Sequence, residues 1–327
     1  MEGTKHAAQQ EGEDGLEEEI LDRSNKPGAI GEGYTLRPSL RELFLTHNRI
    51  ERIERLDALT RLEVLGLRQN LIQKIENLSH LKNLRELELY DNQIQKIENL
   101  DLPNLTHLDL SFNPLRCIEN LQHDQLPCLK ELYLISCKIS KIEGLSSLTT
   151  LTTLELGSNR IRKIEGLDSL VQLENLWLGS NKITRVEGLQ HLTSLKKLSL
   201  QSNRLTELSG FETLINLEEL YLSHNGIATI QGLETLTSLQ ILDISSNRIA
   251  HLENVTHLSS LQELWTNNNQ LESFEEVESL TCLKELETVY LHGNPLAQDT
   301  QYRPKVIRAL PSLTQLDSSM VIRNIPK

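Results

Sequence analysis

Half of the aromatic residues of this chain occupy one position of a repeated phrase. The phrase is Leu-x-x-Leu-x-Leu-x-x-Asn, as in residues 62–70, and the position lies between its last two leucines. From the first repeat to the last, this position is held by Phe44, Gly66, Glu88, Asp109, Tyr133, Glu155, Trp177, Ser199, Tyr221, Asp243, Trp265 and Tyr290. Six of these residues are aromatic and four are acidic, whereas the whole chain contains four Phe, six Tyr and two Trp. Exposed rings flanked by polar groups are typical of protein-binding hot spots, so this aromatic–acidic column is the candidate site.

The column contains no Lys or Arg, which indicates a partner whose contact surface is basic or rich in hydrogen-bond donors. Two other interpretations use the same residues. In the first, the rings pack on neighbouring strands and only stiffen the sheet. In the second, Glu88, Asp109 and Glu155 are acid–base groups of an enzyme, since neighbouring strands bring them to about 5–10 Å. We expect no enzyme, because acids on an open face have nothing to exclude water or shift their pKa.

No sequence pattern indicates a cofactor or a metal ion. Walker loops and the Gly-x-Ser-x-Gly, His-Glu-x-x-His and Cys-x-x-Cys motifs are missing from the chain. The ten histidines are scattered without ligand spacing, and a zinc site built from Cys117, Cys128 and a histidine has little support. We therefore expect no catalytic residue, no cofactor and no metal ion.

The elements that position the column follow from the period of the phrase. Its final Asn recurs every 21 to 25 residues, most often every 22, with Cys137 filling one slot: Asn48, Asn70, Asn92, Asn113, Asn159, Asn181, Asn203, Asn225, Asn247, Asn269 and Asn294. This period and phrase are the signature of the leucine-rich repeat, which contributes one short strand to each turn of a solenoid. The leucines should point inward and the column outward. The Asn amides should satisfy buried backbone groups of adjacent turns.

The second half of each repeat carries Gly or Asn at one slot, as at Asn77 and Gly166, which predicts a tight turn with a left-handed backbone. We predict an α/β leucine-rich-repeat solenoid of about twelve 22-residue repeats, with a parallel sheet on its concave face and a C-terminal cap. Residues 1–33 are acidic and poor in apolar side chains, which predicts a disordered tail. The solenoid with its cap should span 34–317, and a short tail should occupy 318–327.

Composition restricts the partner and the compartment. The formal net charge is −13, which disfavours a phosphate-binding surface, so nucleic acid is not expected as a partner. No apolar run is long enough to span a bilayer and no signal peptide is recognised, so no membrane is expected. The four cysteines lack the clustering of extracellular repeat caps, which favours reduced thiols in the nucleus or cytoplasm. We expect a monomer when the protein is free.

Beyond the general repeat, residues 40–317 resemble the leucine-rich-repeat regulatory subunit of protein phosphatase 1. The matching phrases lie at 67–72, 89–94, 156–162, 222–227, 286–291, 294–296 and 301–303. The resemblance implies that the concave face binds the phosphatase catalytic subunit and controls its activity or maturation, often together with a second small inhibitor protein. It also implies a role in mitotic dephosphorylation in the nucleus.

The family's contact residues correspond to Asp109, Tyr133, Glu155, Trp177, Asp243, Glu263, Trp265 and Tyr290. We add Tyr221, a further aromatic member of the column. Tyr133 and Trp177 stand where the family usually has phenylalanine. The alternative is a leucine-rich-repeat scaffold for another intracellular assembly, spliceosomal, tubulin-folding or ciliary. Spliceosomal relatives have fewer repeats, and ciliary ones usually carry extra domains.

Overall fold

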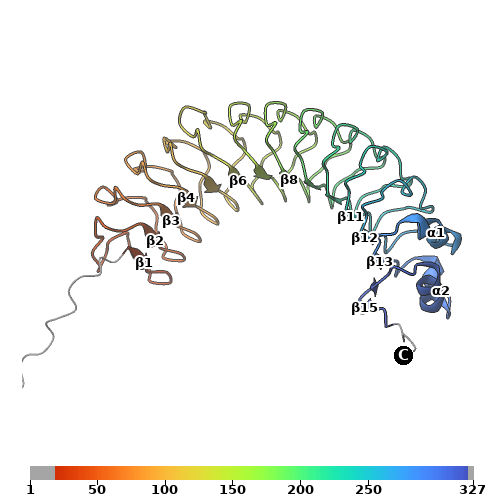
Figure 1. Cartoon of the computed structure of the whole chain (residues 1–327). Helices are drawn as coiled ribbons and strands as arrows, with labels where there is room; N and C mark the ends of the chain where they lie inside the picture. The colour runs from red at the N-terminus through yellow and green to blue at the C-terminus, as the bar shows by residue number, and fades with distance from the viewer. Residues whose placement is uncertain (1–18, 323–327) are drawn as a thin grey trace, which may run out of the picture.

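The computed structural model describes residues 19–322 as a curved solenoid. Its strands line the inner, concave side of the arc, and loops and turns form the outer side (Figure 1). The strands are β1 (Ile20–Asp22), β2 (Glu42–Phe44), β3 (Val64–Gly66), β4 (Glu86–Glu88), β5 (His107–Asp109), β6 (Glu131–Tyr133), β7 (Thr153–Glu155), β8 (Asn175–Trp177), β9 (Lys197–Ser199), β10 (Glu219–Tyr221), β11 (Ile241–Asp243), β12 (Glu263–Trp265), β13 (Thr288–Tyr290), β14 (Gln315–Leu316) and β15 (Ser319–Met320).

These strands form one sheet in chain order, parallel throughout except for the antiparallel pair β14 and β15. The helices of the described chain lie in its C-terminal part: α1 (Glu275–Glu278), α2 (Tyr302–Ala309) and the 3-10 helices η1 (Ser279–Cys282) and η2 (Pro295–Gln298). The predicted solenoid of about twelve repeats with a concave parallel sheet is confirmed, with β2 to β13 as the repeat strands. In the described part, no helix is both long and apolar enough to cross a bilayer.

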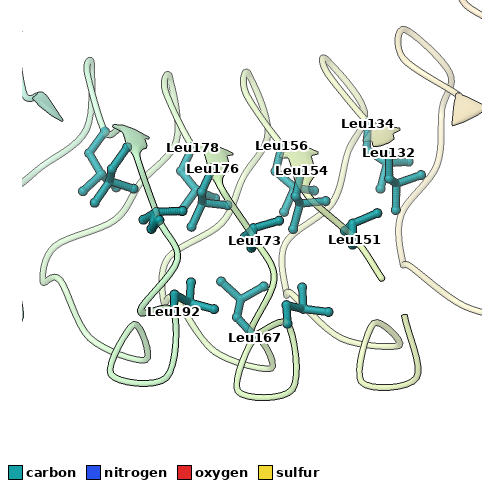
Figure 2. Close-up of a cluster of buried hydrophobic side chains, with 14 of the residues drawn as sticks. Leu132, Leu134, Leu151, Leu154, Leu156, Leu167, Leu173, Leu176, Leu178 and Leu192 are labelled. Carbon is teal, nitrogen blue, oxygen red and sulfur yellow. The ribbon is translucent and has the colours of Figure 1, made fainter. Parts of the chain in front are cut away.

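The core runs along the inside of the solenoid as stacked rows of leucine and isoleucine. Figure 2 shows Leu154 and Leu176 from neighbouring strands, with Leu167 and Leu173 from the segment that joins these two strands. All four are fully buried. Each repeat can bury its apolar face only against its neighbours, so the 22-residue period fixes the strand register. Leu154 pairs with Leu176, and the outward residues Glu155 and Trp177 pair beside them.

The Asn ladder makes the predicted backbone contacts. The Asn181 side-chain amide donates to the carbonyls of Leu156 (2.9 Å) and Leu178 (3.0 Å), and its oxygen accepts the Ile161 N–H at 3.0 Å. Cys137 fills the same slot only in part, because its Sγ contacts two carbonyls at 3.6 Å and accepts no N–H from Leu115, the counterpart of Ile161. Cys137 is therefore a structural residue, and burial raises its pKa to about 11.

The Gly/Asn slot is the predicted tight turn. Gly166 has φ +71°, and a Cβ at this position would stand 2.7 Å from the Ile142 carbonyl oxygen. Asn77 occupies the equivalent slot at φ 57°. Its side-chain amide donates to the Ile53 carbonyl at 2.7 Å. Only residues that tolerate a left-handed backbone fit this slot without strain.

Both predicted domain boundaries need correction. Strand β1 pairs with β2, and Ile30 is fully buried, so the solenoid starts near residue 19, before the predicted residue 34. This segment closes the open edge of the first repeat, which would otherwise expose its hydrophobic face. At the other end, β15 pairs with β14, so the cap extends past residue 317. The remaining parts of the two predicted tails, 1–18 and 323–327, lie outside the described residues.

Candidate partner-binding face

The structure brings all nine predicted site residues onto the concave face. Eight of them end a three-residue strand: Asp109, Tyr133, Glu155, Trp177, Tyr221, Asp243, Trp265 and Tyr290. Glu263 begins β12, two residues before Trp265 on the same face. In-register parallel pairing places the strand-ending residues side by side, as for Trp177 beside Ser199 and Asp243 beside Trp265. The column inferred from the repeat phrase is therefore one continuous row.

The C-terminal half of the column is a run of aromatic rings in mutual contact. Trp177 stacks on Tyr221 with ring centroids 6.3 Å apart, although β9 lies between their strands. Tyr221 contacts Trp265 at 6.2 Å across β11, and Trp265 contacts Tyr290 at 5.9 Å. The intervening Ser199 is small enough for the rings to meet above it. The rings are half-buried, so the expectation that they simply face solvent is wrong: they pack on each other and also present a surface.

Each of three rings is also held by a glutamate on its own strand. The Tyr133 hydroxyl donates to Glu131 at 2.9 Å, and the Tyr221 hydroxyl donates to Glu219 at 2.8 Å. Trp265 Nε1 donates to Glu263 at 3.0 Å. The pKa of Tyr133 and of Tyr221 is raised, mainly by burial and secondly by the hydrogen bond to the glutamate. Both hydroxyls therefore keep their protons.

Sequence reasoning missed Glu131 and Glu219. The signal was present, because the tripeptide Glu-Leu-aromatic coincides with the strands at 42–44, 131–133, 219–221 and 263–265, and the last three of these carry Tyr or Trp. In each case period-two geometry places the first and third residues on the same face of the strand. The glutamates restrict the rotamers of the rings before any partner binds. Glu219 is itself paired with Lys197 at 2.8 Å.

The acids of the column are used partly by the fold itself. Asp109 and Asp243 are buried, at 8% and 6% exposure. Asp109 accepts the Ser111 N–H at 2.9 Å, and Asp243 accepts the N–H and hydroxyl of Ser245 at 3.0 and 2.7 Å. These carboxylates fix the chain as it leaves the strand. They contribute charge to the face more than direct contact area.

Glu155 differs from the other acids because burial dominates its environment. Its carboxylate accepts the Gly157 N–H at 2.9 Å, which alone would favour the charged form. Burial against the sheet outweighs this bond and raises its pKa to about 7. The expectation that nothing on this face could shift a pKa is therefore wrong for Glu155.

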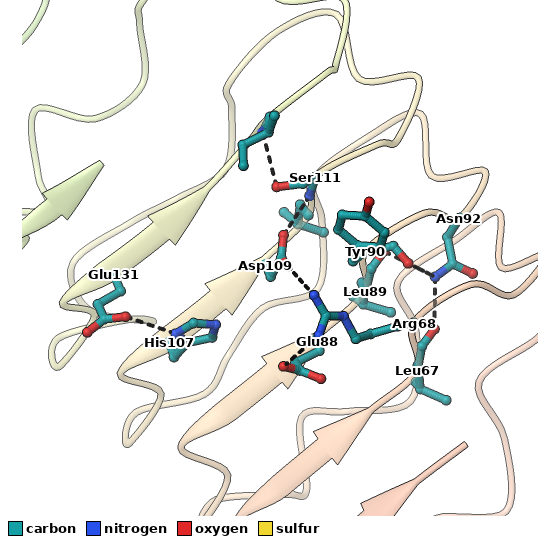
Figure 3. A network of polar contacts seen from close by, with 12 residues as sticks. Leu67, Arg68, Glu88, Leu89, Tyr90, Asn92, His107, Asp109, Ser111 and Glu131 are labelled. Carbon is teal, nitrogen blue, oxygen red and sulfur yellow. Dashed lines mark hydrogen bonds and ion pairs between the residues drawn. The ribbon is translucent and has the colours of Figure 1, made fainter. Parts of the chain in front are cut away.

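A base that the column analysis overlooked reaches the N-terminal end of the face. Arg68 lies 3.7 Å from Glu88 and 3.8 Å from Asp109, with its guanidinium 5.0 Å above the Tyr90 ring centroid (Figure 3). Arg68 lies two residues after Gly66, which is the member of the column in this repeat. Its long side chain extends back across the strands. Arg68 partly neutralises the acids at this end, and Lys197 does the same for Glu219 farther along the face, at 2.8 Å.

Neither a metal centre nor a cysteine site was expected. Within the described range 19–322, no group of three or more His, Cys, Asp or Glu side chains is arranged to hold a metal ion. Cys117 is half-buried, and burial raises the pKa of its thiol. Cys128 is exposed and free.

Comparisons with known proteins agree with this architecture. Family models described as "Leucine-rich repeat" match residues 129–222 and 219–324, and models described as "Leucine Rich repeats (2 copies)" match 38–80 and 82–123. Among solved structures, an internalin from Listeria monocytogenes superimposes with a TM-score of 0.76 at 29% identity, covering 93% of this chain and 87% of that one. A leucine-rich-repeat protein of Leptospira interrogans gives 0.67 at 26% identity, covering 85% and 78%.

A short segment also matches curated relatives. Protein phosphatase 1 regulatory subunit 7 of Homo sapiens is 61% identical over 36 residues, which is 11% of this chain and 10% of the relative. The Danio rerio protein of the same name is 56% identical over a segment of 36 residues. The match thus spans 10% of the length of these relatives. With the family models matching more than half of the sequence, and with the phrase, the sheet and the Asn ladder in place, the chain belongs to the leucine-rich-repeat family.

Proposed function

We propose that this protein is a non-catalytic regulatory subunit that binds the catalytic subunit of protein phosphatase 1 through its concave face. The observation that supports this most is the run of rings from Trp177 to Tyr290, framed by acids on the concave side. Rings held by their neighbours lose little conformational freedom on binding and supply large contact area. The short match to phosphatase regulatory subunits supports the choice of this phosphatase as the partner.

Size supports a folded partner over a small molecule. Twelve repeat strands at ~4.8 Å spacing give a concave face roughly 50 Å long. A globular domain of about 300 residues has a similar diameter, ~50 Å. The acids of the face favour a partner surface that is basic or rich in donors. On this proposal the protein acts in the nucleus and cytoplasm, and it controls the activity or maturation of the phosphatase together with a second small inhibitor.

The test is calorimetric titration of purified phosphatase catalytic subunit into Trp177→Ala and Trp265→Ala. Each variant should lose at least about 2 kcal/mol of binding energy, roughly thirtyfold in affinity. Trp265 contacts two rings and Trp177 one. With an aromatic pair worth about 0.5–1.5 kcal/mol, Trp265→Ala should lower the melting temperature more. Trp177→Phe keeps a ring and should retain most of the binding.

Ile215→Ala is the matched control, because Ile215 is an exposed apolar side chain outside the column. It should leave both affinity and stability unchanged. Wild-type affinity in both tryptophan variants would contradict the assignment of the concave rings as the binding surface. Absence of phosphatase binding by the wild type, with a different assembly captured from lysate, would favour the scaffold alternative.

A further inference from the structure

One edge of the solenoid carries a row of basic side chains that the concave face does not use. Lys138, Arg160, Lys182 and Arg204 each follow the Asn or Cys of the ladder in four successive repeats. We name these four residues the basic ladder. Their positions stack in register, because each N–H bonds to a carbonyl of the preceding turn: Arg160 to Ile139 (2.8 Å), Lys182 to Ile161 (2.8 Å) and Arg204 to Ile183 (2.9 Å).

The basic ladder is an uninterrupted run of four. The equivalent position is Leu71, Gln93 and Pro114 in the three preceding repeats and Gly226 in the next one, and it is basic again only at Arg49 and Arg248. Arg162 lies two residues after Arg160 and Arg185 lies three residues after Lys182, so both add positive charge in the same repeats. Side chains stacked at ~4.8 Å with the same charge repel one another. The local sequence thus concentrates cations where none is needed for packing.

These cations are not compensated within the described chain. Among residues 19–322, no acid lies within ion-pair distance of any member of the basic ladder, although the whole chain has a formal net charge of −13. Two other lysines of these repeats are paired instead: Lys141 with Glu143 at 3.1 Å, and Lys196 with Glu174 at 3.0 Å. Three ladder side chains are exposed and Lys182 is half-exposed. The ladder is therefore a free cationic surface on an acidic protein.

We propose that the basic ladder is a second binding site, which takes an extended acidic stretch of a protein partner. Three steps of ~4.8 Å span about 14 Å, the length of roughly four to five extended residues at ~3.3 Å each. Several consecutive Asp or Glu residues fit this span. Each residue of the basic ladder lies beyond the end of its strand, whereas the aromatic–acidic column lies on the strands. The two sites are therefore separate, and both can be occupied together.

The chemistry of the ladder favours an acidic peptide over nucleic acid. Single-stranded nucleic acid is bound by basic grooves that include aromatic platforms for the bases. The four repeats have no aromatic residue between the ladder position and the following tight turn. Glu143, Glu165 and Glu187 follow Lys138, Arg160 and Lys182 by five residues. A polyanion much longer than the ~14 Å of the basic ladder would meet these acids and the net negative charge of the chain, whereas a short acidic stretch contacts the basic ladder alone.

The test is fluorescence anisotropy of a labelled eight-residue polyglutamate peptide titrated with the full chain. The variant Arg160→Glu/Lys182→Glu should lose at least about tenfold in affinity. The neutral pair Arg160→Gln/Lys182→Gln should lose less. The matched control Lys74→Glu/Lys96→Glu carries the same charge change on exposed residues that already pair with Glu98, and it should stay close to wild type. Binding should weaken as salt rises.

Three results would overturn the proposal. The first is no peptide binding by the wild type at low ionic strength. The second is an equal loss in the Lys74/Lys96 control, which would mean that net charge alone attracts the peptide. The third is tighter binding of an eight-nucleotide oligothymidine than of the peptide. Trp177→Ala should bind the peptide like the wild type, so failure of the phosphatase proposal and failure of this one are distinguishable.

Discussion

The central Asn ladder offers the most direct test of how this fold is held together. Asn181 donates through its amide to the carbonyls of Leu156, Leu178 and Gly179, at 2.9, 3.0 and 3.3 Å. Its oxygen accepts the Ile161 N–H at 3.0 Å. The side chain is 8% exposed. Asn181→Ala removes all four bonds.

The stability lost in Asn181→Ala depends on which backbone groups keep another hydrogen-bond partner. The three carbonyls keep other donors: Asn159 for Leu156, Asn203 for Leu178, and the Ser158 N–H for Gly179. Only the Ile161 N–H loses its acceptor. A buried donor left unpaired costs about 1–3 kcal/mol. With the space left by the amide, we expect Asn181→Ala to lower the free energy of unfolding by about 2–4 kcal/mol.

Urea unfolding followed by circular dichroism measures this loss. Hydrogen exchange at the Ile161 amide should accelerate more than exchange in distant repeats, because repeats couple mainly to their neighbours. Asn216→Ala is the control: Asn216 is exposed and donates one bond, to the Thr193 carbonyl at 2.8 Å. Its effect should stay within about 0.5 kcal/mol. An unchanged unfolding curve together with unchanged exchange at Ile161 would refute the role assigned to the ladder.

Three further predictions concern Cys137, Glu155 and the N-terminal segment. Cys137→Asn supplies the acceptor that the Leu115 N–H lacks and should raise the free energy of unfolding by about 1 kcal/mol, measured in urea; a destabilised variant would contradict this. In the folded protein the pKa of Glu155 is raised to about 7 from 4.5, so between these pH values the folded state binds more protons than the unfolded state. The stability of the wild type relative to Glu155→Gln should therefore fall as pH rises from about 4.5 to 7 and level off above. Melting curves across that range check the sign, and the difference should be on the order of 1–3 kcal/mol. Deleting residues 1–18 should leave the melting temperature unchanged, whereas deleting 1–33 removes β1 and buried Ile30 and should lower it; equal effects would count against a capping role for 19–33.

The sequence by itself determined the repeat, the strand register and the column. Leu154, Asn181 and Trp177 take their places from one 22-residue phrase, because each turn contacts mainly the turns beside it and the same contacts recur along the solenoid. Period-two alternation then assigns the inward and outward faces. For the same reason all nine predicted site residues lie together on the concave side.

Only the tertiary structure decided how side chains from different turns meet. Trp177 reaches Tyr221 across Ser199 because the ring is longer than the spacing of the strands and the intervening side chain is small. Arg68 bends back onto Glu88, and Lys182 has no acid within ion-pair distance among residues 19–322, although nothing in the phrase distinguishes the two cases. Residues 19–33 lack the phrase, yet they cover the first repeat because its open edge must be buried. These outcomes depend on side-chain length and on neighbours one or two turns away, and a repeat pattern specifies neither.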